Sequence, residues 1–411
     1  MKAFSGKLFT GIQSITPLER IVGISFLISI LLPHIGVLYL VNPILLFFLG
    51  KKFSNKRLVS DLQIVMVTII GVSLIWNIFY GIPVTSKSLI RGIYIVELLL
   101  FFPFIGDTRF RNIYIYIAVI VILLSQVAYI WDLGLVINMM DYLYPYTGAL
   151  DSESTEYLLE HSAEATSISE LQNIRFGGLF HNSNQCMKYI SLCSVIFVVE
   201  NYRRPIKTHL PFWFMVFSST LLSGSRTGLV IVFSAILMMV FIRRNTRVSL
   251  RSVAIYAIVI SSILWAISVA FSGEFRMFDI KEGTSDGGSI MLKYDNLKYY
   301  LGLITEIRQI LVGNFDVESI KAVYHTPFSQ FDSEWGNAVY FYGFFFLIIY
   351  FAFLIRTFSK LKGINIIALL LFFWIISSTI LFSYRTSFAF FLILSRCYYN
   401  SQLRVYDKSY H

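Results

Sequence analysis

Residues 62–80 read LQIVMVTIIGVSLIWNIFY, and no charged side chain interrupts them. A helix rises about 1.5 Å per residue, so a run of this length matches the ~30 Å hydrocarbon layer of a bilayer. The run is preceded by a basic cluster that contains Lys51, Lys52, Lys56 and Arg57. Basic residues beside an apolar run are typical of the cytoplasmic end of a membrane span. This stretch therefore predicts a helix that crosses a membrane from the inside to the outside.

The composition of the whole chain agrees with this stretch. Hydrophobic residues make up 56% of the 411 residues and charged residues 14%, against roughly 25% charged in soluble proteins. A soluble core cannot hide that much apolar surface. The composition also excludes disordered, collagen-like, disulfide-rich and coiled-coil chains. We therefore expect an all-α polytopic membrane protein.

Apolar runs recur along the chain, and about twelve of them are long enough to form spans if their polar flanks are included. They are Ile21–Leu32, Ile35–Leu49, Leu62–Tyr80, Leu89–Ile105, Ile113–Ile130, Met187–Val199, Leu210–Leu222, Leu229–Ile242, Val253–Phe271, Ala338–Ile355, Ile364–Phe382 and Phe388–Tyr399. The first run follows Arg20 and lacks a small-residue cleavage site, so we expect it to be a retained span.

The positions of the charges predict the orientation of these spans. If the N-terminus is cytoplasmic, 22 of the 34 Lys and Arg residues fall in cytoplasmic segments. This distribution obeys the positive-inside rule and places both chain ends in the cytoplasm. The cytoplasmic segments are 1–20, 50–60, 106–112, 200–209, 243–251, 356–363 and 396–411.

Two long segments, Trp131–Phe180 and Ser272–Gly336, fall on the outer side and hold 18 of the 24 acidic residues. Loops of this length without a role are uncommon. Periodicity predicts short helices within them, at Thr155–His161 and Ile290–Leu311. The expected organisation is N-terminal membrane helices (1–130), a first extracytoplasmic loop (131–180), central membrane helices (181–271), a second extracytoplasmic loop (272–336), and C-terminal membrane helices with a cytoplasmic tail (337–411).

Three arginines depart from the charge pattern because they fall at the outer surface. Arg175 ends the first outer loop, whereas Arg226 and Arg385 occupy the short outer turns Ser223–Gly228 and Ser383–Ser387. An arginine at such a place needs an anionic partner, and its guanidinium holds phosphate in a bidentate manner. Pairing with a loop carboxylate or with lipid phosphate is the alternative for each one. Because all three arginines are expected at the same outer membrane surface, we favour one anionic ligand that they share.

Other polar residues near these turns are candidates for acid–base work or substrate contact. His325 has the residue type of a general base, although a lone histidine is more often structural. Glu334 competes for that role, and Asp332 either assists or caps the next helix. Glu97, inside an apolar run, is expected to pair with Arg91 or Lys188. The candidate substrate-binding residues are His181, Asn184, Tyr384 and Asp332, and a polar cap of the following helix is the alternative role of the first two.

No motif indicates a metal ion or a nucleotide. The chain has no glycine-rich phosphate loop of the Gly-x-x-x-x-Gly-Lys type, no metal-ligand spacing, and no Asp-x-Asp in an outer loop. We therefore expect no metal, no cofactor and no nucleic-acid partner.

The chain resembles the bacterial O-antigen polymerase and O-antigen ligase superfamily. The resemblance rests on the segment 175–184 (RFGGLFHNSN), the turn 223–228 (SGSRTG), and a long outer loop that ends near His325 and 332–336. It covers most of the chain from residue 173 onward. The order of these short motifs carries the similarity.

The resemblance implies a GT-C-like, metal-independent glycosyltransferase at the periplasmic face of the bacterial inner membrane. Its donor and its acceptor would be oligosaccharides on undecaprenyl pyrophosphate, and a chain-length regulator protein is a possible partner. Arg175, Arg226 and Arg385 would bind the pyrophosphate. His325, or Glu334 in its place, would take the proton of the acceptor hydroxyl.

The last outer loop favours polymerase over ligase. Ligases carry an Arg-x-x-x-His-x-His pattern there, whereas this chain has Lys321, His325 and Pro327 at the corresponding positions. A ligase that transfers glycan to a lipid acceptor remains an alternative, as does a lipid-linked oligosaccharide flippase or transporter. A flippase would not need two large outer loops, and a transporter often shows internal repeats, which are absent from the sequence.

Overall fold

The computed structural model describes residues 17–31, 61–82, 84, 86–105, 110–131, 177–180, 183–201, 204–225, 228–229, 232–233, 235–236, 239, 306–314, 334–359, 381 and 386–396. Over these residues the chain is helical and contains no strand. The helices are α2 (Pro17–Leu31), α4 (Asp61–Phe79), α5 (Ser86–Ile105), α6 (Asn112–Trp131), α10 (Ser183–Asn201), the 3₁₀-helix η2 (Ile206–His209), α11 (Leu210–Ser223), α16 (Ile307–Val312) and α18 (Glu334–Ser359). A further helix covers Thr386–Arg396.

The predicted all-helical class is confirmed for this part of the chain. Two helices, Asp61–Phe79 and Glu334–Thr357, are long and apolar enough to cross a membrane. The polar flanks do extend the shorter apolar runs, since α10 begins at Ser183 and ends at Asn201. The count of about twelve spans stays a prediction, and the predicted helix Thr155–His161 lies outside the described residues.

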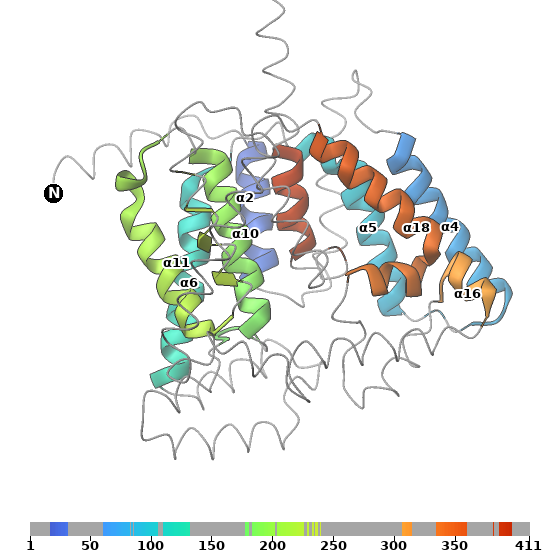
Figure 1. Cartoon of the computed structure of the whole chain (residues 1–411), viewed down its shortest axis with the longest axis horizontal. Helices are drawn as coiled ribbons and strands as arrows, with labels where there is room; N and C mark the ends of the chain where they lie inside the picture. The colour runs from blue at the N-terminus through green and yellow to red at the C-terminus, as the bar shows by residue number, and fades with distance from the viewer. Residues whose placement is uncertain are drawn as a thin grey trace, which may run out of the picture.

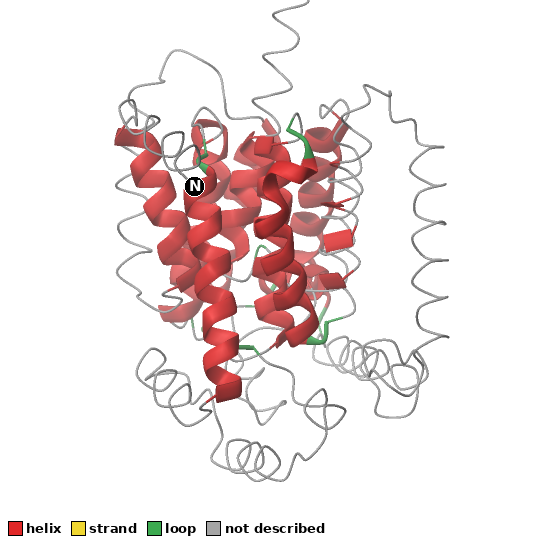
Figure 2. Cartoon of the chain, turned by 90° about the vertical axis from the view of Figure 1, so that its left-hand side faces the viewer, coloured by secondary structure: helices red, strands yellow, loops and turns green. Residues whose placement is uncertain are grey.

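The helices form two groups that share one hydrophobic core (Figure 1). In one group α6 contacts α2, α10 and α11, and in the other α4 contacts α5, α16 and α18. The helix Thr386–Arg396 lies between the two groups. Seen from the side, the longer helices run roughly alongside one another (Figure 2). This arrangement lets interior side chains of both groups pack into one continuous cluster.

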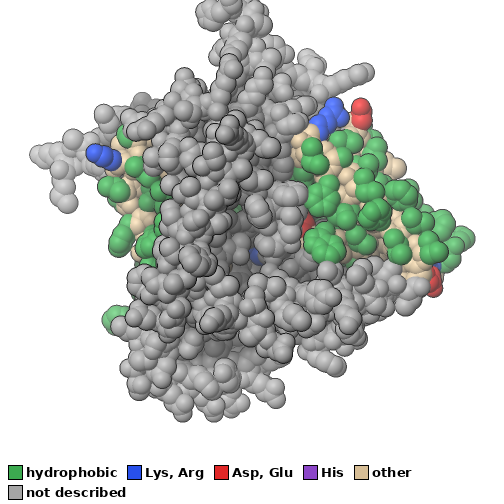
Figure 3. All heavy atoms as spheres, in the orientation of Figure 1, with side chains coloured by type: hydrophobic (Ala, Val, Ile, Leu, Met, Phe, Trp, Pro, Cys, Tyr) green, Lys and Arg blue, Asp and Glu red, His purple; other side chains and the backbone are tan. Residues whose placement is uncertain are grey.

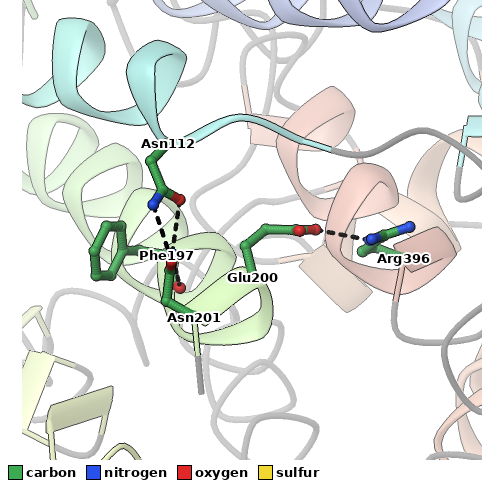
Figure 4. Close-up of polar contacts among 5 residues, drawn as sticks. All are labelled: Asn112, Phe197, Glu200, Asn201 and Arg396. Atoms are coloured by element: carbon green, nitrogen blue, oxygen red, sulfur yellow. Dashed lines mark hydrogen bonds and ion pairs between the residues drawn. The ribbon is translucent and has the colours of Figure 1, made fainter. Parts of the chain in front are cut away.

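A polar layer closes one end of the first group (Figure 4). The amides of Asn112 and Asn201 bond to each other in both directions, with N–O distances of 2.9 and 2.7 Å. Glu200 forms an ion pair with Arg396 at 2.8 Å. A fourth segment joins through Glu19, which lies 3.8 Å from Arg111. Four segments that the charge pattern assigns to the cytoplasmic side therefore meet at the same end.

Helix α18 is broken at Gly343, where φ is +84°. Only glycine adopts this conformation readily, and a Cβ there would overlap with the carbonyl of Leu311 in α16. The break frees carbonyl groups, and residues of other segments lie close to two of them. The backbone N–H of Asn314 donates to the Tyr340 carbonyl at 2.5 Å, and the Ser73 hydroxyl lies 3.3 Å from the Phe341 carbonyl oxygen. Helix α16 therefore docks into the break in α18.

The predicted helix Ile290–Leu311 is wrong at residue 306. Glu306 has extended backbone angles and is the N-cap of α16, with which it forms a capping box through Gln309. The Gln309 side chain accepts the Glu306 N–H at 3.3 Å, which satisfies a donor that helix formation leaves free. The apolar periodicity gave no sign of this extended residue, and residues 290–305 of the prediction lie outside the described residues.

Candidate functional site

The structure describes two of the predicted site residues and several segments that adjoin the others. Glu334 is fully described, and Asn184 lies in α10 with its side chain outside the description. The remaining predicted site residues, Arg175, Arg226, Arg385, His325, His181, Tyr384 and Asp332, lie outside the described residues.

The turn after Arg175 is seated on α6. Residues 177–180 are buried, and the backbone N–H of Leu179 donates to the Ser125 hydroxyl at 3.1 Å. Gly178 has φ +58°, and a Cβ at this position would overlap with the Ser125 side chain. The Gly177-Gly178 pair thus allows the chain to approach α6 closely. The Ser125 hydroxyl therefore determines where along α6 this turn packs.

The next residue of α6, Gln126, binds α11. Its amide nitrogen donates to the Ser219 carbonyl at 3.1 Å, and the Ser219 hydroxyl donates to its Oε1 at 2.5 Å. The same nitrogen lies 3.5 Å from the sulfur of Cys186 in α10. All three residues are buried. Two adjacent residues of α6 therefore hold the turn after Arg175, the beginning of α10 and the last turns of α11.

The segment around Arg226 begins with a defined helix end and a defined helix start. Gly224 ends α11 in the left-handed conformation (φ +60°), with its N–H bonded to the Leu221 carbonyl. Ser225 then starts the next helix, because its hydroxyl accepts the Gly228 N–H at 3.4 Å. This is the arrangement of an N-cap serine. The sequence expectation that this turn leads into a helix is confirmed by these bonds.

Glu334 begins α18 and is fully buried. Its Oε1 accepts the hydroxyl of Tyr350 at 3.2 Å and the backbone N–H of Leu381 at 2.6 Å. Leu381 lies four residues before Arg385. The carboxyl group thus anchors the segment that enters the third arginine turn. These contacts favour a positioning role for Glu334, and its role as a base remains a prediction.

Residues 315–333, which include His325, connect two fixed points. At one end Asn314 bonds to Tyr340 of α18. At the other end Glu334 is held by its own contacts within the protein.

Sequence reasoning missed the roles of Ser125 and Gln126. Both lie inside an apolar run, and polar side chains in such runs are often interhelical contacts in membrane proteins. That signal was available in residues 113–130. A polar residue alone, however, does not indicate which helix it faces.

The predicted pairing of Glu97 is not formed. The residue is 6% exposed, and neither carboxylate oxygen has a hydrogen-bond partner in the described part of the chain. Arg91, one of the two predicted partners, instead places its guanidinium 4.9 Å from the ring centroid of Phe341. The reason is helical spacing: Glu97 follows Arg91 by six residues, so the two side chains point in different directions from α5.

The chain matches no protein-family model and no curated protein. The functional conclusion therefore rests on the sequence motifs and on the described contacts.

Proposed function

We propose that this protein is a polysaccharide repeat-unit polymerase of a bacterial inner membrane. It would transfer a glycan from undecaprenyl pyrophosphate to a sugar hydroxyl of another lipid-linked repeat unit. In this proposal about twelve spans cross the membrane, and the active site faces the periplasm.

The observation that carries the proposal is the junction on α6. Ser125 holds the turn that follows Arg175, and Gln126 holds the end of α11 that precedes Arg226. An extended chain covers at most ~3.6 Å per residue. Arg175 is four residues from Leu179, so chain length alone keeps it within ~14 Å of that anchor. This supports the expectation that the two arginines share a ligand.

The proposed chemistry needs charge stabilisation and proton transfer. Attack by the acceptor hydroxyl on the anomeric carbon forms the new glycosidic bond and breaks the bond to the pyrophosphate oxygen. Arg175, Arg226 and Arg385 would stabilise the negative charge on the departing undecaprenyl pyrophosphate. His325 would accept the hydroxyl proton. Glu334 would hold the segment before Arg385, in keeping with its bond to Leu381.

The proposal is tested by extension of a defined lipid-linked repeat unit with purified protein. Arg226→Ala should lower the rate about 10²–10³-fold, the usual cost of removing one electrostatic stabiliser. Arg204→Ala is the matched control, because Arg204 is exposed on the segment predicted to be cytoplasmic. A chelator should leave the rate unchanged. A strict metal requirement would contradict the arginine mechanism.

Lipid-linked glycans from cells that carry Arg226→Ala separate the alternatives. Accumulation of a single outward-facing repeat unit supports a polymerase. Accumulation of long polymer on the lipid carrier supports a ligase, and an inward-facing repeat unit supports a flippase. If none of these species changes, the glycosyltransferase proposal is wrong.

A further inference from the structure

Helix α16 turns its apolar side away from the protein. Ile307, Ile310 and Leu311 are spaced i, i+3, i+4 and so share one helix face. They are 76%, 41% and 40% exposed. The neighbouring polar residues Arg308 and Gln309 are only half-exposed. A surface helix in water has the opposite arrangement, so this exposed face suits an apolar surrounding.

The contacts of α16 with α4 show how far it reaches along that helix. The Arg308 guanidinium lies 4.4 Å from the ring centroid of Tyr80, just past the end of α4. One turn further along α16, the carbonyl of Val312 accepts the hydroxyl of Ser73. Ser73 lies seven residues before Tyr80, which is about 10 Å along a helix. Helix α16 therefore runs back beside the part of α4 that is long and apolar enough to cross a membrane.

The contacts of α16 with α18 show independently how far α16 reaches past the end of a neighbouring helix. Asn314, two residues beyond α16, bonds to the carbonyl of Tyr340. Tyr340 follows the first residue of α18, Glu334, by six residues, or about 9 Å of helix. Both neighbouring helices thus place the end of α16 well inside their own ends.

The irregular backbone after α16 is buried, and its N–H groups are bonded. Gly313 donates to the carbonyl of Gln309 (2.9 Å) and Asn314 to the carbonyl of Tyr340 (2.5 Å). Inside a bilayer, non-helical backbone is tolerated only where protein surrounds it and satisfies its polar groups. The burial and the two N–H groups of this segment agree with that condition.

The exposed face of α16 also continues an apolar surface on α4. Ile64, Val72, Ile75 and Phe79 are all exposed along one side of α4. In the space-filling view, hydrophobic side chains cover the right-hand side of the molecule, where α4 and α16 lie (Figure 3). Acidic and basic side chains appear at the upper end of this side and at its lower corner, and hydrophobic side chains cover the surface between them. The exposed apolar faces of α16 and α4 therefore suit the same apolar surrounding.

We infer that α16 and residues 313–314 form a re-entrant segment, with Ile307, Ile310 and Leu311 among the lipid acyl chains of the outer leaflet. The inference rests on the membrane insertion and orientation in the proposed function. Arg308 and Tyr80 then lie near the headgroups, where arginine and tyrosine are favourable. Residue 315, the first of the residues that lead to His325, would consequently follow a position within the outer leaflet.

Nitroxide labels in proteoliposomes test this placement. The background is Cys397→Ser, because Cys186 and Cys193 are buried in α10 and the unlabelled background measures their residual reaction. Labels are placed at Ile310→Cys on α16, at Ile75→Cys on the exposed face of α4, and at Lys207→Cys on exposed η2. Collision with oxygen reports acyl-chain surroundings, and collision with a water-soluble nickel chelate reports water.

The inference expects the label at position 310 to resemble the label at position 75, with high oxygen and low nickel accessibility. If position 310 resembles position 207 while position 75 stays in lipid, α16 lies in water and the inference is wrong. Low accessibility to both reagents at position 310 means that protein covers the face, which also overturns it. If position 75 itself is accessible to nickel, the proposed membrane placement fails as well, and this result is distinct from the other two.

Discussion

Gln126 uses both ends of its amide to join α6 to α11, and the adjacent Ser125 holds the turn that follows Arg175. These hydrogen bonds link segments that are far apart in the sequence. The apolar run 113–130 predicts the helix that carries these residues. It does not predict their partners, because a hydrophobic run contains no information on which neighbouring helix faces which side.

The first prediction concerns this junction. Gln126→Leu keeps a similar side-chain volume but leaves the Ser219 hydroxyl without its acceptor, so we expect a loss of about 1–3 kcal/mol of stability. Thermal unfolding in detergent measures it. The matched control is Ser194→Ala, because the Ser194 hydroxyl bonds to the Ile190 carbonyl of its own helix and to no other segment that the structure describes. Addition of Ser219→Ala to Gln126→Leu should cost less than the sum of the single changes; strict additivity would show that the two side chains do not depend on each other.

The second prediction concerns His209 at the end of η2, whose Nδ1 lies 3.5 Å from the hydroxyl of Tyr116. Burial, and secondly the nearby positive charge of Arg204, lower the pKa of His209 below its ordinary value of 6.5. As the pH falls below that value, the unfolded chain binds a proton before the folded chain does, so stability decreases. The melting temperature should therefore fall between pH 7 and pH 5. His209→Gln should make that fall smaller, and an unchanged slope would contradict the assignment.

At the scale of elements, apolar runs predicted most helices to within a few residues, as for α4 and α6. The break in α18 was not predicted, because Gly343 lies in an aromatic run that reads as one continuous helix. Its cause is the approach of α16, a segment that precedes it by some thirty residues in the sequence. Local periodicity does not record such an approach.

The third prediction tests this break. Gly343→Ala forces a side chain into a positive-φ conformation, which costs about 1–3 kcal/mol, and its Cβ would also displace Leu311. We expect a lower melting temperature in detergent. Gly71→Ala in α4 is the control, since a Cβ there meets nothing within 4 Å and alanine favours a helix by up to about 1 kcal/mol. Equal effects of both substitutions would show that the break is not required.

At the scale of the whole molecule, the charge pattern carries the most information. It grouped segments 1–20, 106–112, 200–209 and 396–411 on one side, and contacts such as Asn112–Asn201 and Glu200–Arg396 bring these segments to one end. Which helices pack against each other could not be predicted from the sequence. Charges indicate on which side of a membrane a segment lies, and they do not indicate which helices are adjacent. The roles of the three arginines of the candidate site remain predictions, because these residues lie outside the described part of the chain.

The fourth prediction tests the orientation. A membrane-impermeant maleimide is applied to intact cells whose outer membrane has been made permeable. Glu306→Cys, in the second predicted outer loop, should react in these cells. Lys207→Cys, in η2, should react only after the inner membrane is opened. The reverse pattern would show that the orientation is inverted, and reaction of both in intact cells would exclude the proposed topology.

The donor that satisfies the Tyr340 carbonyl beside the break in α18 has a consequence for how the protein is made. Asn314 precedes α18 in the chain, so the ribosome synthesises it before Tyr340 emerges. A helix with a free carbonyl group is costly in lipid. Here the donor is already available when the helix is made, and biosynthesis in the N-to-C direction therefore suits the order in which this bond has to form.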